Sequence, residues 1–119
     1  MASPERVVEN ILSERYRWLD VFYTDMLGFL KNVTLPASQI DPSNFKEGIV
    51  RIEGKSIAYE DKEYITLYPD PDTFSPIPWE PNTVRLIGNS KADFDPRVIL
   101  QRTQGVLKKE KMEARIGCE

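Results

Sequence analysis

The chain has 119 residues, of which 40% are hydrophobic and 29% are charged, and its formal net charge is −3. This length suits one domain with a single modest core, and the hydrophobic fraction is that of a globular protein rather than a disordered one. The acidic balance is unlike the broad basic surface of nucleic-acid-binding proteins. No apolar run approaches the ~20 residues that span a bilayer. We therefore expect neither nucleic acid nor a membrane as a partner.

Cysteine and histidine usage narrows the possible chemistry. Cys118 is the one cysteine, so no intramolecular disulfide can form, and we expect the reducing cytoplasm as the location. The first ten residues lack the pattern of a secretory signal. The sequence contains no histidine, which removes the commonest general base and a usual zinc ligand. A catalyst built from this chain alone would depend on carboxylates, lysine or tyrosine.

The first part of the chain predicts a helix and a β-hairpin. Ser3 and Pro4 are typical of an N-cap followed by a proline at the first helical position. The apolar spacing that follows predicts a helix over about 4–15. Two apolar, β-branched runs, at 16–25 and 29–38, flank the segment Asp-Met-Leu-Gly, which is a plausible hairpin turn.

The second part predicts shorter strands and one more helix. A helical turn over 41–45 precedes strand candidates at 48–54, 63–69 and 82–89. The pair Asp95-Pro96 then begins a second helix, whose predicted apolar face comprises Val98, Ile99, Arg102, Val106 and Leu107. A small mixed sheet that carries helices is an α+β arrangement.

Residues 67–82 contain five prolines and are either a flexible linker or an ordered loop. Flexible linkers are poor in aromatic residues, whereas this stretch holds Tyr68, Phe74 and Trp79. We therefore predict an ordered loop. Because proline lacks a backbone donor, we do not expect the stretch to pair as an inner strand. Trp79 is a candidate interface residue, and Trp18 is a candidate for either an interface or the core.

Four segments, taken in order, resemble the N-terminal β-grasp domain of glutamine synthetase. They are the hairpin at 20–40, the loop Glu-Gly-Lys-Ser-Ile at 53–57, the proline stretch at 67–79 and the helix start at 95–102. The resemblance implies an α+β, β-grasp-like fold in which a small mixed sheet packs with helices. It also implies that the proline stretch is a fixed loop of that domain.

The resemblance divides the chain at its C-terminal end. Residues 1–112 would be the β-grasp domain, and residues 113–119 would start a truncated strand of the larger catalytic domain. By resemblance, Glu119 is a metal ligand, but the site is incomplete here. The full-length family implies ATP and Mg or Mn, which the missing domain would hold, so we expect this chain alone to bind no cofactor.

The loop at 53–57 carries the positions that resemble a binding site. By position, Glu53 matches the aspartate that helps to bind ammonium in the family, and Ser56 matches a nearby serine. Two departures fall on the same site: Lys55 replaces another serine, and Tyr64 stands where an aspartate would fall. A lysine beside a carboxylate competes with ammonium for it. The alternative interpretation is that Glu53 and Lys55 form a solvated turn.

The resemblance implies a domain that is not catalytic on its own. It would pack against a catalytic domain or a full-length glutamine synthetase-like subunit and complete an inter-subunit glutamate–ammonia ligase site. The chain would be a fragment, a truncated gene product or a split piece, and a homo-oligomer is a further expected partner arrangement. The alternative is a free-standing interaction module that binds or modulates a full-length glutamine synthetase. An independent small enzyme is disfavoured because histidine and a metal-binding cluster are missing.

Overall fold

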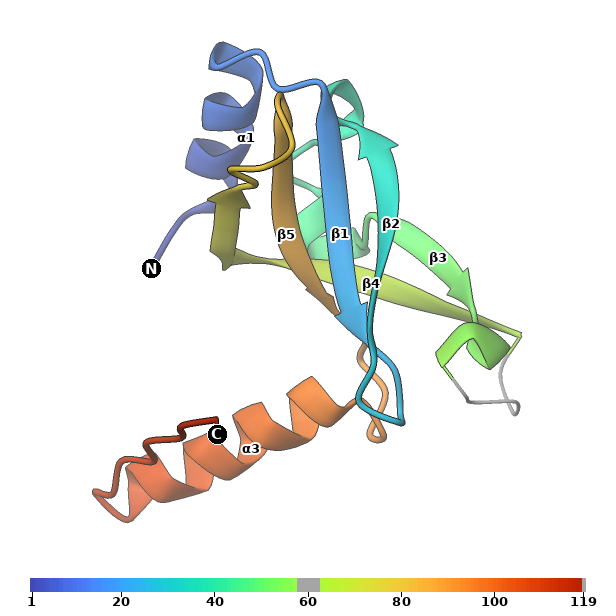
Figure 1. Cartoon of the computed structure of the whole chain (residues 1–119). Helices are drawn as coiled ribbons and strands as arrows, with labels where there is room; N and C mark the ends of the chain where they lie inside the picture. The colour runs from blue at the N-terminus through green and yellow to red at the C-terminus, as the bar shows by residue number, and fades with distance from the viewer. Residues whose placement is uncertain (58–62, 119) are drawn as a thin grey trace.

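The computed structural model describes residues 1–57 and 63–118. Its five-stranded sheet has the strand order β2-β1-β5-β4-β3 (Figure 1). The sheet is mixed, because the first strand runs antiparallel to the second and parallel to the fifth, which confirms the predicted α+β class. In chain order the elements are α1 (Pro4–Ser13), β1 (Trp18–Thr24), β2 (Leu30–Pro36), η1 (Ala37–Gln39), α2 (Asn44–Glu47), β3 (Val50–Glu53), η2 (Gly54–Ile57), β4 (Tyr64–Pro76), β5 (Thr83–Asn89) and α3 (Pro96–Lys109).

Helix α1 begins at the predicted cap and packs on the sheet. The backbone N–H of Arg6 donates to the side-chain oxygen of Ser3 at 3.3 Å, and Pro4 occupies the first turn. The apolar face of the helix joins the core shared with β1, β3, β4 and β5. Its buried members are Val7, Val8 and Ile11. The predicted first helix is therefore confirmed, and it supplies part of the hydrophobic core.

Strand β1 lies between β2 and β5, and the predicted hairpin is confirmed. Its core-facing side chains include Leu19 and Val21, both at 0% exposure. Asp20 points to the opposite face and is also buried, where its carboxylate accepts a hydrogen bond from the hydroxyl of Thr34 at 2.6 Å. This cross-strand bond satisfies the buried carboxylate and helps to fix the register of β1 against β2.

The proline stretch is ordered, as predicted, but part of it forms a strand rather than a loop. Strand β4 continues through Pro69 to Pro76 and pairs with β5 on both sides of an irregularity between Asp70 and Ser75. The predicted loop is therefore wrong for the residues up to Pro76, which form a strand, but the expectation that the prolines exclude pairing as an inner strand agrees with the structure. The pairing of β4 with β3 ends at Leu67, so β4 has a strand partner on one side only where the prolines occur.

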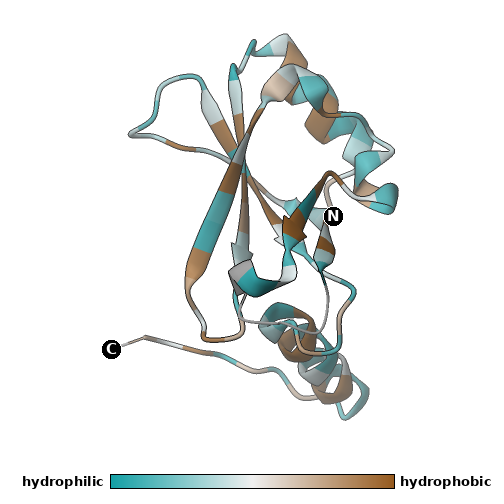
Figure 2. Ribbon diagram, turned by 90° about the vertical axis from the view of Figure 1, so that its right-hand side faces the viewer, coloured by the Kyte–Doolittle hydropathy of each residue, from teal (hydrophilic) through white to brown (hydrophobic). Residues whose placement is uncertain are grey.

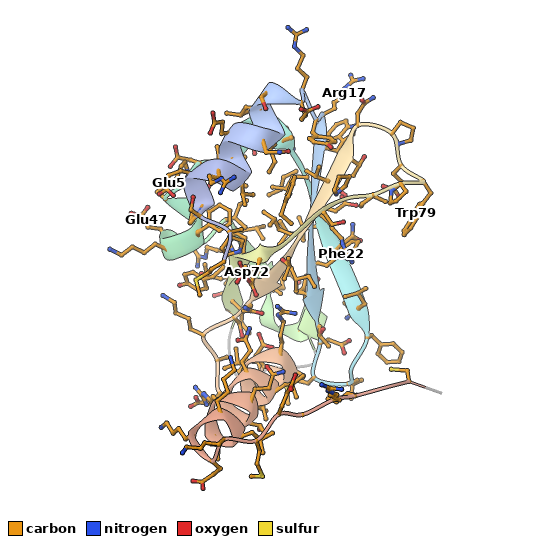
Figure 3. All side chains as sticks on the ribbon, turned by 90° about the vertical axis from the view of Figure 1, so that its left-hand side faces the viewer. Glu5, Arg17, Phe22, Glu47, Asp72 and Trp79 are labelled. Carbon is orange, nitrogen blue, oxygen red and sulfur yellow. The ribbon has the colours of Figure 1, made fainter. Side chains whose placement is uncertain are left out.

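The turn that follows β4 presents Trp79 outward. The N–H of Ile77 donates to the carbonyl of Thr83 at 3.0 Å, and the N–H of Glu80 donates to the carbonyl of Ile77 at 3.1 Å. The indole of Trp79 is 80% exposed and projects away from the sheet (Figure 3). Trp18 is 41% exposed, so the option that placed it in the core is wrong.

Helix α3 begins as predicted, yet its apolar face is uncovered. The carboxylate of Asp95 accepts hydrogen bonds from the N–H groups of Arg97 and Val98, and it also accepts from both the N–H and the hydroxyl of Ser90. The guanidinium of Arg97 reaches Asp70 at 2.7 Å, which ties this helix start to β4. All of α3 is described, and none of its residues is buried. The predicted helix is therefore confirmed, and its apolar face does not join the described core.

The remaining predicted elements are confirmed in outline. The turn predicted at 41–45 is present as α2 with a preceding turn at Asp41, and the weak strand candidate is β3. Residues 113–118 form neither helix nor strand in the described structure, so their pairing with a larger domain stays a prediction. Among the described residues, no helix has both the length and the apolar character needed to cross a membrane.

Candidate functional site

The predicted site residue Glu53 is the last residue of β3, at the edge of the sheet. Its backbone is opposite Tyr64 of β4 in the strand register. The next residue, Gly54, donates its N–H to the carbonyl of Glu63 at 2.9 Å. Pairing with β4 therefore fixes the backbone of Glu53. The chain then turns directly into η2.

The ammonium group of Lys55 meets the carboxylate of Glu53. The distance between Lys55 Nζ and Glu53 Oε2 is 3.2 Å, and the two side chains are 76% and 56% exposed. This pairing agrees with the predicted competition of lysine for the carboxylate. Its exposure agrees equally with the solvated-turn interpretation, since exposed ion pairs stabilise proteins little. The geometry thus brings together the carboxylate that the resemblance assigns to ammonium and a cation of the same chain.

A second cation borders Glu53 and was missed from the sequence. Arg51 lies two residues before Glu53 on β3, so both side chains lie on the same face of the strand. The guanidinium carbon of Arg51 is 5.0 Å from the centroid of the Tyr64 ring, within the range of a cation–π contact. The alternation of strand residues was the available signal for placing Arg51 beside Glu53.

The other two residues assigned by resemblance are described only in part. Ser56 lies in η2, one residue after Lys55, and its side chain is outside the described part of the structure. Glu119, the incomplete metal site, lies outside the described residues altogether. Both assignments stay predictions.

The β1–β2 turn presents apolar side chains on a firmly hydrogen-bonded base. The buried carboxylate of Asp25 accepts from the N–H groups of Leu27 and Phe29 at 2.9 and 2.8 Å and pairs with Lys31 at 3.2 Å. Gly28 takes a positive φ of 89° at the turn, a conformation that glycine adopts readily. The tip is therefore held in one shape although its large side chains face outward.

Asp25 also has a perturbed acidity. Burial by itself raises the pKa of this carboxyl group, but the hydrogen bonds from Phe29, Lys31 and Leu27 and the charge of Lys31 outweigh it. The pKa of Asp25 consequently lies below its ordinary value of 3.8. The carboxylate is ionised at neutral pH and acts as a structural acceptor for the turn.

The turn and α3 together form an apolar end of the molecule, which we call the α3 end. Figures 1 and 2 both place the β1–β2 turn and α3 at the lower end, away from the packed helix α1. Exposure of the large hydrophobic side chains there runs from 42% to 74%. They are Met26, Leu27, Phe29, Leu30, Ile99, Leu100, Val106, Met112 and Ile116. Apolar surface gathered in this way is typical of an interaction surface.

The described residues lack a cluster that fits a catalytic metal. Among them, no group of three or more histidine, cysteine, aspartate or glutamate side chains is arranged to hold an ion. The absence of histidine from the sequence removes one ligand type entirely. Glu53 already contacts a lysine, which makes it a poor ligand for a cation. Within residues 1–57 and 63–118, no side-chain cluster of this kind is therefore available to hold a metal ion.

Comparisons with known proteins agree on one family. The family described as "Glutamine synthetase, beta-Grasp domain" matches residues 15–91. A glutamine synthetase of Sulfolobus acidocaldarius is 31% identical over 82% of this chain, and one of Thermococcus kodakarensis is 34% identical over 97%. These matches cover 23% and 27% of the two relatives, so the chain spans about a quarter of the length of the curated relatives it matches.

A solved structure supports the same fold. The GmaS/ADP complex superimposes with a TM-score of 0.74 over 87% of this chain and 26% of that protein. The sequences are 18% identical in this comparison, so the likeness concerns the fold alone. It shows that the sheet and its helices are arranged as in one part of a larger protein.

Proposed function

The chain belongs to the glutamine synthetase family through its β-grasp domain, and from this premise we propose that it docks by its α3 end against the catalytic domain of a glutamine synthetase-like subunit. In that position the loop of Glu53 would complete an inter-subunit site at which glutamate and ammonia are joined. The chain would contribute a carboxylate that accepts hydrogen bonds from ammonium, and it would not contribute the groups that transfer the phosphoryl group.

The uncovered face of α3 is the observation that carries the docking proposal. A helix of 14 residues is marginally stable in water without tertiary packing, and this one buries none of its side chains among the described residues. Ile99 and Val106 are 49% and 59% exposed. Burial of such side chains against another protein surface stabilises both the helix and the complex, because apolar area is removed from water.

In this proposal the catalytic domain, and not this chain's described residues, carries out phosphoryl transfer. Phosphoryl transfer from ATP needs divalent metal ions held by several oxygen ligands. ATP and metal use belongs to the full-length family, and the described residues of this chain do not fit a metal site. The chain matches about a quarter of its relatives' length, and we assign those groups to the family's catalytic domain and no step of the reaction to a metal bound by the described residues.

Co-elution tests the proposed docking. The purified chain is mixed with full-length glutamine synthetase from the source organism and run on a sizing column. We expect wild type to co-elute and the double variant Ile99→Glu/Val106→Glu to elute alone, because the new charges would be buried. Leu12→Glu is a matched control at an exposed apolar position of α1 and should co-elute. Failure of wild type to co-elute, or undiminished binding by the double variant, would contradict the proposal.

The second candidate function is a free-standing module that binds and modulates a synthetase without completing its site. The contact of Lys55 with Glu53 favours this alternative, because an occupied carboxylate is a weaker acceptor for ammonium. Glu53→Ala in the assembled complex separates the two functions. Site completion predicts that glutamine formation needs more ammonium in the variant, whereas a modulator predicts an unchanged ammonium dependence.

A further inference from the structure

The contact between Lys55 and Glu53 has a chemical consequence for the loop. We propose that Lys55 is a tethered competitor of ammonium at the carboxylate of Glu53, so that its side chain sets how much ammonium the site requires. This inference rests on the proposed function, which puts Glu53 on the amine side of the inter-subunit site. It adds a residue that tunes the affinity of that site for its smallest substrate.

The two groups lie two residues apart, at a strand end that β4 holds in place. Glu53 ends β3, where pairing with Tyr64 and the hydrogen bond from Gly54 to Glu63 fix the strand. Lys55 follows after a single residue, in η2, and its ammonium nitrogen is 3.2 Å from the carboxylate. The pair therefore forms within one strand end and its turn, and it is in place before any partner binds.

The lysine side chain and the ammonium ion present the same chemistry to the carboxylate. Each carries one positive charge and donates N–H hydrogen bonds, and neither accepts one. A short tether gives the attached group an effective concentration in the millimolar range or above. Free ammonium competes with Lys55 for the Oε2 oxygen of Glu53, and at the other oxygen it meets the repulsion of the lysine charge. The lysine therefore raises the ammonium concentration that the site requires.

The expected size of the effect follows from the exposure of the pair. Exposed ion pairs contribute about 0.2–1 kcal/mol, which corresponds to a competition of up to about fivefold. In an assembled site that excludes water, the attraction between the same charges becomes stronger. Arg51, on the same face of β3, adds a second positive charge and is itself engaged with the ring of Tyr64. Both cations act against the entry of a third.

Nuclear magnetic resonance of the isotope-labelled full chain tests the competition directly. The side-chain carboxyl carbon of Glu53 is followed while ammonium chloride is added, and tetramethylammonium chloride of equal ionic strength serves as the reference because it donates no hydrogen bonds. Lys55→Met removes the charge and preserves a long side chain. Its matched control is Lys91→Met, which removes a lysine that stacks at 4.0 Å on the ring of Tyr68.

We expect the ammonium-specific response of Glu53 in Lys55→Met to occur at a concentration lower by up to about fivefold than in wild type. Lys91→Met should titrate as wild type does, and the double variant Glu53→Gln/Lys55→Met should lose the response. In the assembled enzyme, Lys55→Met should lower the ammonium concentration needed for half-maximal rate.

Coincident titration curves for wild type and Lys55→Met would overturn the inference. The titration uses the chain alone, so it gives its answer whether or not the chain docks to a synthetase. Loss of co-elution would remove the proposed function and leave the competition at Glu53 intact. Normal co-elution with coincident curves would remove only the role of Lys55.

Discussion

Helices α1 and α3 begin with the same sequence signal and end in opposite environments. Both start with a capping residue followed by proline, at Ser3-Pro4 and at Asp95-Pro96. The cap of α3 is the better bonded, since Asp95 accepts from the backbone of the helix and from Ser90. Yet α1 buries three side chains in the core, and α3, described along its whole length, buries none.

This difference shows that the signals that form a helix do not determine whether the helix is buried. Capping and apolar spacing are local, so they specify both helices equally. Burial depends on the surface that faces the helix. Here α1 packs against the sheet, whereas α3 lies away from it (Figure 1). Helix α1 is part of the domain's own core, and the α3 end is the surface on which the proposed docking rests.

The largest expected effect on stability comes from a substitution in the packed helix α1. Ile11 of α1 is fully buried, so Ile11→Ala leaves a cavity and should lower the free energy of unfolding by about 2–5 kcal/mol. The matched change Val106→Ala, in exposed α3, should stay within about 0.5 kcal/mol of wild type. Urea denaturation of both variants checks the contrast. Equal losses would show that α3 packs as tightly as α1.

The next largest loss of stability is expected when the N-cap side chains of α1 and α3 are removed. Asp95→Ala removes two bonds to the start of α3 and leaves Ser90 without its acceptor, and it should lower the free energy of unfolding by about 1–2 kcal/mol. Asp95→Asn, which retains a good capping residue, should lose less. Ser3→Ala, whose cap has a single bond at 3.3 Å, should cost about 0.5–1 kcal/mol. A larger loss in Ser3→Ala than in Asp95→Ala would reverse the ranking.

A glycine inside α3 sharpens the comparison in the stabilising direction. A side-chain carbon at Gly105 would have no atom within 4 Å, so Gly105→Ala should stabilise the helix locally by about 0.5–1 kcal/mol. Hydrogen exchange of the α3 amides measures this change. Gly88→Ala in β5 is the contrasting control, because the added carbon would lie 3.0 Å from Val21 and should destabilise the sheet. Faster exchange in Gly105→Ala would contradict an uncovered helix.

The smallest expected effect is a change in stability at acidic pH, caused by Asp25 in the β1–β2 turn. Because the pKa of Asp25 lies below 3.8 in the folded chain, its stabilising contribution is present above that value and is lost as the pH falls through the lower folded pKa. The pKa of Asp41 is lowered too, chiefly by its hydrogen bonds with Ser43. We therefore expect Asp25→Asn to flatten the acid loss of stability only in part. Denaturation curves at several acidic pH values check the slope, and an unchanged slope would remove this role of Asp25.

Much of the fold was predictable because its signals lie within short segments. The hairpin, both long helices and strand β5 were expected close to where they occur, since cap residues, turns and side-chain alternation act over a few residues. The pairing of β4 through Pro69 was not predictable from these signals. It depends on the end of β3 at Leu67, which leaves the prolines with a strand partner on one side only.

The candidate site divides in the same way. The resemblance located Glu53, Lys55 and Tyr64 in the sequence, and charge alone suggested the competition between the first two. That Lys55 reaches the carboxylate depends on the turn of η2, and that Arg51 covers the ring of Tyr64 depends on the pairing of β3 with β4. Sequence distance does not specify such contacts, because the same residues in another turn would point apart.

By itself the sequence determined the α+β class, the helix starts at Ser3 and Asp95, the hairpin around Gly28 and the family to which the chain belongs. Only the tertiary structure decided that α1 is buried, that α3 is uncovered and that Arg51 lies over the ring of Tyr64. The physical reason is the range of the interactions. Local conformation is set by neighbours along the chain, whereas burial and cross-strand contacts are set by the segments that folding brings together in space.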